Sequence, residues 1–241
     1  MNEPKLKIFS DFDGTITLFD TWIEMGEKFI KDKNKWAEVI SSFEEQKIGA
    51  RECFLAECSL IEDFDLDVFN RIIDSQRLDP QFVSFYEFCT LNSIPFIILS
   101  EGMDYYISRI LKNYGLNIPF YSNKLVFLEN KTKLGLEFPY SDSDCTKCGT
   151  SKRNILMNHT ADDEISVFIG DGFSDACVVN YADIVFAKKS LASYCWKHNI
   201  TYQEYQTFGD IRKKIEKLLS SKKLKHRDAA RQKRREVFLR G

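Results

Sequence analysis

Short apolar runs alternate with amphipathic stretches along most of this 241-residue chain. Four runs are continuously apolar at their centres and bounded by polar or turn residues: 5–10, 94–100, 164–171 and 182–188. Strands that are covered on both faces have this pattern, because neither face meets water. Helical patterns separate the runs, as in 103–115, where Gly115 suits a helix end. The alternation predicts an α/β fold with an open, largely parallel sheet and helices on both sides.

Two insertions interrupt this alternation. Residues 21–46, 50–61 and 66–75 repeat apolar positions at helical spacing. A structureless connection of that length is uncommon in a compact domain, so a helical cap is the better account. Two further apolar runs flank "NKTK" and predict a β-hairpin. The predicted parts are a catalytic core of 1–17 and 89–221, a helical cap of 18–88, a hairpin insertion of 117–150 and a basic C-terminal tail of 222–241.

Composition limits the location and class of the protein. Hydrophobic residues make up 44% of the chain, which is ordinary for a globular protein. No apolar run approaches the roughly 18–20 residues that span a bilayer, and "MNEPKLK" is followed by no apolar signal-peptide region. Seven cysteines, an odd number, favour reduced thiols when no export signal is present. We therefore expect a cytoplasmic protein without a membrane partner.

The net charge of −2 conceals a charge asymmetry. Residues 222–241 carry nine Lys and Arg against two acidic residues, so the tail is +7 and the remainder −9. Such a tail can attract nucleic acid or an anionic membrane. No aromatic residue stands among the basic ones before Phe238. We therefore expect a solvated, partly helical extension, and a nucleic-acid partner is not expected.

Acidic side chains gather at the ends of the predicted strands. Asp11 and Asp13 follow the first strand, Asp171 ends the third, and Asp175 lies one helical turn further on. Ligands bind beyond the carboxyl ends of parallel strands, where these carboxylates would meet and repel one another. A cation offsets that repulsion, and oxygen ligands with acidic charge suit Mg²⁺. The sequence therefore predicts a magnesium site.

The same positions carry a family resemblance. "DFDGTIT", "ILSEG", "CGTSK" and "GDGFSD" resemble, in this order, the four motifs of the haloacid dehalogenase (HAD) superfamily. The likeness spans residues 8 to about 188. Within the superfamily the chain resembles the phosphoserine-phosphatase-like branch (subfamily IB), whose members carry a helical cap after the first motif. The resemblance implies a three-layer, Rossmann-like core.

The resemblance also implies residue roles. Asp11 would be the nucleophile that becomes an aspartyl phosphate, and Asp13 would be the general acid and base. Ser100 would donate a hydrogen bond to the phosphoryl group, and Lys152 would neutralise its charge. The implied phosphate-binding residues are Gly14, Ser100, Glu101, Gly102 and Lys152. The implied Mg²⁺ ligands are the Asp11 and Asp171 carboxylates and the Asp13 carbonyl, with Asp175 as a further ligand or an orienter of metal-bound water.

An acid/base at Asp13 favours a phosphatase acting on a small phosphomonoester, because pumps and dehalogenases of the superfamily lack that carboxylate. A phosphomutase remains an alternative. So does a non-catalytic module that uses the fold and the basic tail to hold a phosphorylated ligand or nucleic acid, since a fold alone does not fix a function. The sequence does not indicate an oligomeric state.

The lysine of the third motif and the role of two cysteines leave alternatives open. Lys147 and Arg153 compete with Lys152 for the third-motif role, but Lys152 stands directly before an apolar helical pattern, "NILM". Cys145 and Cys148 form a lone "CTKC", and a zinc site needs four ligands, so free thiols in a loop are the simpler interpretation.

"PFIILSEGMDYYI" and "CGTSKRNIL" resemble the methionine-salvage phosphatases, which act on a phosphorylated enol of a diketo-methylthiopentyl compound. This chain departs from that branch's "SGGMD" and "CGxCK" at Glu101 and Ser151. On the cap side, Asp20 and Arg51 are candidate contacts for the leaving group, although both residue types are usually surface charges.

Overall fold

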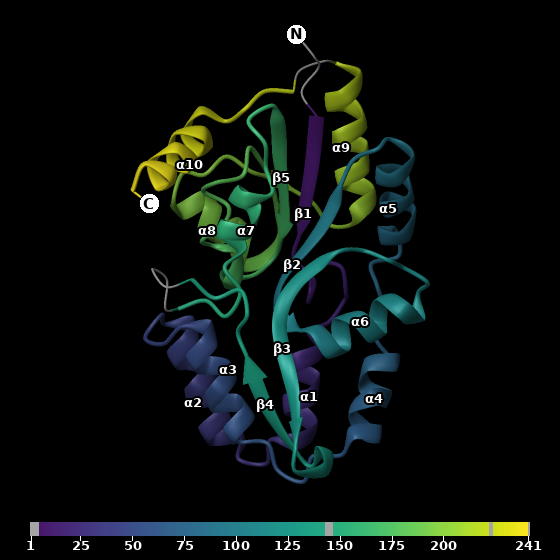
Figure 1. The fold of residues 1–241 in the computed structure, drawn as a ribbon, viewed down its shortest axis with the longest axis vertical. Helices are drawn as coiled ribbons and strands as arrows, with labels where there is room; N and C mark the ends of the chain where they lie inside the picture. The colour runs from purple at the N-terminus through teal and green to yellow at the C-terminus, as the bar shows by residue number, and fades with distance from the viewer. Residues whose placement is uncertain (1–4, 143–146, 222–223, 241) are drawn as a thin grey trace. The chain divides into compact units, whose positions relative to one another are not determined.

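The computed structural model describes residues 5–142, 147–221 and 224–240 (Figure 1). The strands are β1 (Lys5–Ser10), β2 (Phe96–Met103), β3 (Phe120–Leu128), β4 (Lys133–Glu137), β5 (Glu164–Gly170), β6 (Ile184–Ala187) and β7 (Gln203–Glu204). The α-helices are α1 (Thr21–Phe29), α2 (Lys33–Glu44), α3 (Ala50–Ser59), α4 (Leu66–Asp74), α5 (Phe82–Leu91), α6 (Asp104–Asn113), α7 (Lys152–Asn158), α8 (Lys189–Lys197), α9 (Phe208–Ser220) and α10 (Asp228–Arg240).

The chain folds into two compact units. The first comprises residues 1–16, 78–99 and 152–241, and the second comprises 17–77 and 100–151. Strand β2 contributes its first half to one unit and its second half to the other. The helix α5 belongs to the first unit, whereas α6 and the β3–β4 hairpin belong to the second together with α1 to α4.

The first unit is built on a parallel sheet. Hydrogen bonds give the strand order β4-β3-β2-β1-β5-β6-β7, in which β1 pairs in parallel with β2 and β5. The four predicted strands are confirmed as β1, β2, β5 and β6, and their central residues, such as Ile8 and Phe168, are fully buried. Figure 1 shows α5 and α9 on one side of this sheet and α7 and α8 on the other. The predicted α/β fold class is therefore confirmed.

Aromatic packing joins α5 and α9. The rings of Phe82 and Phe208 lie 4.9 Å apart at an interplanar angle of 70°, and Phe85 also contacts Phe208. All three side chains are fully buried. Edge-to-face aromatic pairs of this kind are stabilising beyond the area they bury. This cluster joins two helices that are far apart in the sequence.

The second unit contains a buried polar network. The indole nitrogens of Trp22 on α1 and Trp36 on α2 donate to the two carboxylate oxygens of Glu57 on α3, at 2.9 and 2.8 Å. Glu57 is only 2% exposed, and burial raises its pKa, while the two indole donors act in the opposite direction. Buried polar groups need such partners to avoid a desolvation cost. The tryptophans are therefore core residues that join three helices.

The basic tail is helical, as expected, but some of its residues pack against other residues of the first unit. The Arg234 guanidinium lies 3.1 Å from both carboxylate oxygens of Asp183 and donates to the Tyr181 carbonyl at 2.6 Å. Arg227 donates its backbone N–H to Asp183 at 3.0 Å, and Ala230 is fully buried. The expectation of a solvated extension is therefore wrong for these residues. The physical reason is that Asp183, buried at the start of β6, needs a cationic partner.

We expect Arg234→Met to lower the free energy of unfolding by about 1–3 kcal/mol, because Asp183 keeps its burial but loses charge-assisted hydrogen bonds. Urea denaturation followed by circular dichroism measures this loss. Arg231→Met is the matched control, since Arg231 is exposed on the same helix, and its effect should stay within about 0.5 kcal/mol. Equal stabilities of the two variants would show that the docked guanidinium contributes nothing.

Candidate active site

Three acidic residues of the first unit lie at the carboxyl ends of neighbouring strands. Asp11 directly follows β1, and its backbone N–H donates to the Ile169 carbonyl of β5 at 2.9 Å. Asp171 directly follows β5, and Asp175 ends a short 3-10 helix, Phe173–Asp175. Since β1 and β5 are parallel neighbours, their ends meet at one edge of the sheet. Chain topology alone therefore brings these carboxylates together.

The three carboxylates form a compact, buried cluster. Asp11, Asp171 and Asp175 each offer an oxygen, and these oxygens lie within 4.8 Å of one another. Among the described residues this is the one cluster of three or more acidic or soft ligands with the spacing for a metal ion. Asp175 is fully buried, and the other two are less than a tenth exposed. Close carboxylates at this depth require compensating positive charge.

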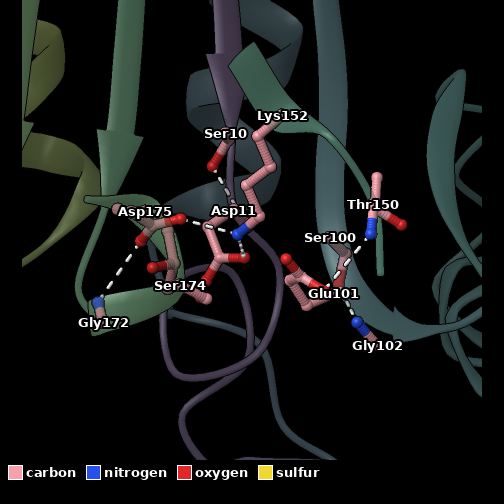
Figure 2. A network of polar contacts seen from close by, with 12 residues as sticks. Ser10, Asp11, Ser100, Glu101, Gly102, Thr150, Lys152, Gly172, Ser174 and Asp175 are labelled. Carbon is pink, nitrogen blue, oxygen red and sulfur yellow. Dashed lines mark hydrogen bonds and ion pairs between the residues drawn. The ribbon is translucent and has the colours of Figure 1, made fainter. Parts of the chain in front are cut away.

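Lys152 supplies part of that charge. Its ammonium, at the start of α7, lies 2.6 Å from an oxygen of Asp11 and 2.6 Å from an oxygen of Asp175 (Figure 2). The lysine is fully buried. Of its two sequence competitors, Lys147 is exposed and Arg153 lies with its guanidinium 5.9 Å from the centre of the Tyr181 ring. The geometry therefore favours Lys152 as the lysine of the acidic cluster.

The cluster perturbs the acid–base behaviour of its members. Burial raises the pKa of Asp11 to about 7; Asp175 and Asp171 add to this rise, and Lys152 opposes it. Burial also raises the pKa of Asp175. Burial lowers the pKa of Lys152, but the two carboxylates beside it raise it well above its ordinary value. Lys152 therefore stays charged at neutral pH and remains the cation between Asp11 and Asp175.

Both oxygens of Asp175 are engaged within the protein. One pairs with Lys152, and the other accepts hydrogen bonds from the backbone N–H groups of Asp171 and Gly172 at 3.1 and 3.2 Å. A Cβ on Gly170 would lie 2.3 Å from the same carboxylate, so this position has room for glycine alone. Asp175 is thus suited to fixing the loop that carries Asp171 and to orienting Lys152.

Asp171 faces the turn after β1. Its Oδ1 accepts a hydrogen bond from the Thr15 hydroxyl at 3.2 Å, and its Oδ2 lies 2.8 Å from the Lys189 ammonium. Gly14 has a φ of +70°, and a Cβ there would lie 2.6 Å from the Asp171 carboxylate. Glycine is needed here both for its left-handed conformation and for this close approach.

These features fit a magnesium ion. The donors are carboxylate oxygens, which Mg²⁺ prefers, and one oxygen of each aspartate lies within 4.8 Å of the other two. The absence of a side chain at Gly14 lets the Asp171 carboxylate come close to the turn after β1. The residues that would hold Mg²⁺ are Asp11 and Asp171, with Asp175 behind them. Asp13 lies half-buried in the turn, and the predicted use of its carbonyl as a ligand stays a prediction.

Lys189 was not among the residues selected from the sequence. It is the second residue after β6, where "ADIVFAKK" places two lysines at the carboxyl end of a predicted strand. That position is the available signal, because the carboxyl end of β6 lies at the same sheet edge as those of β1 and β5. That signal is weak, because lysines at a helix start are common on protein surfaces.

The predicted phosphate-loop residues Ser100, Glu101 and Gly102 belong to the second unit. The Ser100 hydroxyl accepts a hydrogen bond from the Gly102 N–H at 2.8 Å. The Glu101 carboxylate accepts from the N–H groups of Gly149 and Thr150 at 2.9 and 3.3 Å, as Figure 2 shows for Thr150. The Glu101 carboxylate therefore holds the loop that leads into Lys152. A role of these residues in binding phosphate stays a prediction.

Asp20 and Arg51, the predicted substrate contacts, also have structural partners in the second unit. Asp20 caps α1 by accepting hydrogen bonds from the N–H groups of Trp22 and Ile23 at 2.9 and 3.0 Å. The Arg51 guanidinium lies 5.7 Å from the centre of the Phe138 ring. Asp20 therefore fills a helix-capping role that its position alone explains. Cys145 of the "CTKC" stretch lies outside the described residues, and Cys148 is half-buried.

Comparisons with known proteins agree with this geometry. The family model for haloacid dehalogenase-like hydrolases matches residues 8–179. A 2-hydroxy-3-keto-5-methylthiopentenyl-1-phosphate phosphatase of Lysinibacillus sphaericus (strain C3-41) is 28% identical over 220 residues, covering 89% of this chain and 95% of its own. The enzyme of that name from Bacillus cereus (strain B4264) is also 28% identical over 220 residues, with 90% and 99% covered.

Solved structures show the same fold. A phosphoserine phosphatase, determined as a phospho-aspartyl intermediate analogue, superposes with a TM-score of 0.67 at 17% identity, covering 91% of this chain and 99% of that one. Because the family model matches most of the chain, the protein belongs to the haloacid dehalogenase-like hydrolase family. None of the helices within the described residues combines the length and apolar character that a membrane crossing requires.

Proposed function

We propose that this hydrolase is a Mg²⁺-dependent phosphomonoesterase that works through a phosphorylated Asp11. The observation that carries the proposal is the buried cluster of Asp11, Asp171 and Asp175, with the Lys152 ammonium 2.6 Å from Asp11. A nucleophilic carboxylate, a fixed cation beside it and an oxygen-lined metal site are the parts that phosphoryl transfer needs. The similarity to named phosphatases supports the same reaction class.

The proposed reaction has two displacements at phosphorus. A carboxylate oxygen of Asp11 attacks the phosphoryl group, the ester P–O bond breaks, and Asp13 gives its proton to the leaving oxygen. Asp13 then takes a proton from water, whose oxygen attacks the same phosphorus and breaks the bond to Asp11. Orthophosphate leaves and both aspartates return to their starting state. When bound, Mg²⁺ supplies charge neutralisation for the phosphoryl oxygens.

The remaining residues would bind the phosphoryl group and orient the Asp11 carboxylate. Lys152 holds the Asp11 carboxylate at a fixed angle and offsets charge on the transferring group. Ser100 and the N–H groups at Gly102 and Gly14 would donate hydrogen bonds to phosphoryl oxygens, and the helical cap would limit access of water. Glu101 would support phosphate binding indirectly, because it holds the loop that precedes Lys152.

We propose a small phosphorylated metabolite as substrate. The names of the curated relatives point to 2-hydroxy-3-keto-5-methylthiopentenyl 1-phosphate as the first compound to try, and those of the solved structures to phosphoserine. Asp20 and Arg51 remain candidates for leaving-group contacts; Asp20→Ala should affect the stability of α1 in any case, because it removes the cap. A changed ratio of activities between two substrates would separate a contact from a cap.

Hydrolysis of p-nitrophenyl phosphate should be rapid with millimolar Mg²⁺ and should fall to background after treatment with EDTA, returning when Mg²⁺ is restored. Activity depends on the metal because a buried cluster of carboxylates without Mg²⁺ cannot stabilise an approaching phosphate dianion. Release of orthophosphate is the measurement. A binding module gives no release under either condition, and a phosphomutase gives transfer to a second hydroxyl in place of free phosphate and is activated by a bisphosphate.

A further inference from the structure

Lys189 is fixed at the acidic cluster by the backbone around it. It begins α8 with a φ of +49°, a left-handed conformation that lysine rarely adopts. The next residues attach the helix start to the cluster, because the Leu191 N–H and the Ser190 hydroxyl both donate to the Asp171 carbonyl, at 3.0 and 3.2 Å. A strained residue that its neighbours hold in place is a candidate for a functional position.

The ammonium of Lys189 contacts a carboxylate that would be a metal ligand under the proposed function. It is 2.8 Å from the Oδ2 of Asp171 and 3.4 Å from the Gly14 carbonyl oxygen. A Cβ built on Gly14 would lie 3.2 Å from the same ammonium and 2.6 Å from Asp171. Lys189 therefore occupies the space beside Gly14 that the absence of a side chain leaves open.

The other nearby lysines do not have this position. Lys152 pairs with Asp11 and Asp175. The Lys188 ammonium lies 5.0 Å from the centre of the Tyr205 ring, and burial lowers its pKa. Lys189 is thus the cation in direct contact with the Asp171 carboxylate among the residues described.

We propose that Lys189 is a built-in competitor for Mg²⁺ at Asp171: its ammonium neutralises that carboxylate in the metal-free protein and must leave when the ion binds. This inference rests on the proposed function, since it assumes that Asp171 is a metal ligand. An ammonium in contact with Asp171 and a divalent ion bound to the same carboxylate repel each other. The competition lowers the apparent affinity for Mg²⁺ and stabilises the empty site.

The surroundings of Lys189 give the displaced ammonium a place to go. Its side chain is 58% exposed, whereas that of Asp171 is 11% exposed, so the lysine can return to water at little cost while the carboxylate cannot. A cavity of about 610 Å³ adjoins the lysine, and the exposed Glu204 carboxylate is part of its wall. Release of the ammonium therefore needs only a change of side-chain rotamer.

The test compares Mg²⁺ binding by four full-length proteins after removal of metal with EDTA. They are wild type, Lys189→Met, Lys189→Arg and Lys214→Met, the last being a control at an exposed lysine on α9. Isothermal titration with MgCl₂ at low salt should give Lys189→Met an affinity about three- to tenfold higher than wild type, the effect of removing one partly screened charge beside a divalent ion. The arginine variant and the control should bind as wild type does.

Thermal unfolding provides a second readout that does not depend on activity. Without metal, Lys189→Met should melt below wild type because Asp171 has lost its cation, and saturating Mg²⁺ should raise its melting temperature by more. Equal or weaker Mg²⁺ binding by Lys189→Met would overturn this inference alone. A failure of all four proteins to bind Mg²⁺ would overturn the proposed metal-dependent function together with it.

Discussion

Asp11→Asn is expected to remove hydrolysis while leaving the fold intact. An amide nitrogen or oxygen cannot replace a carboxylate oxygen as nucleophile toward phosphorus, so turnover should fall by a factor of about 10³ or more. The side chain keeps its size, and Lys152 keeps Asp175 as an ion-pair partner. The substitution also removes a carboxyl whose pKa is raised to about 7, first by burial and then by the nearby Asp175 and Asp171.

Phosphate release under saturating Mg²⁺ measures the effect, and urea denaturation measures the fold. The free energy of unfolding in the absence of metal should be unchanged or higher than that of wild type, because a buried repulsion is relieved. Asp163→Asn, at an exposed position before β5, is the matched control and should retain full turnover. Normal hydrolysis by Asp11→Asn would exclude Asp11 as the phosphoryl acceptor and, with it, the proposed mechanism.

The first unit could be predicted from the sequence because its strands are buried on both faces. Continuous apolar runs such as the one ending at Ser10 leave little ambiguity when helical patterns separate them. The same reasoning predicts that Asp11 and Asp171 lie at one sheet edge, since parallel neighbours end on the same side. The two-residue strand β7 left no comparable signal, because a run that short has no periodicity.

The partners of charged residues could not be predicted, because pairing depends on distance in space. Nothing in the local sequence of the tail indicates that Arg234 meets Asp183, which lies 51 positions earlier. Likewise the sequence shows Glu101 only as a departure from the "SGGMD" motif, and it does not show that the Glu101 carboxylate accepts hydrogen bonds from backbone N–H groups 48 and 49 positions later. Composition describes how much charge a segment carries, and the tertiary fold decides where that charge is neutralised.

The largest expected loss of stability follows from Lys152→Met. The methionine keeps much of the lysine stem but removes the ammonium that pairs with Asp11 and Asp175 at 2.6 Å each. Because both carboxylates stay buried, the free energy of unfolding at neutral pH without metal should fall by about 3–5 kcal/mol. Hydrolysis should also be lost, since neither the nucleophile nor the transferring group retains its fixed cation. Urea denaturation and phosphate release measure the two effects separately.

The pH dependence of Lys152→Met distinguishes lost charge from lost packing. Burial already raises the pKa of Asp11, and removal of Lys152 takes away the main influence that lowers it. A carboxyl whose pKa is higher in the folded than in the unfolded state binds protons on folding, so the stability deficit should shrink as the pH falls from neutral toward about 5. Lys152→Met combined with Asp175→Asn should recover part of the stability at neutral pH and none of the hydrolysis, because it removes one stranded charge without restoring the cation. A deficit that stayed constant with pH, or that the second substitution did not reduce, would mean that the lysine stem, and not its charge, stabilises this part of the core.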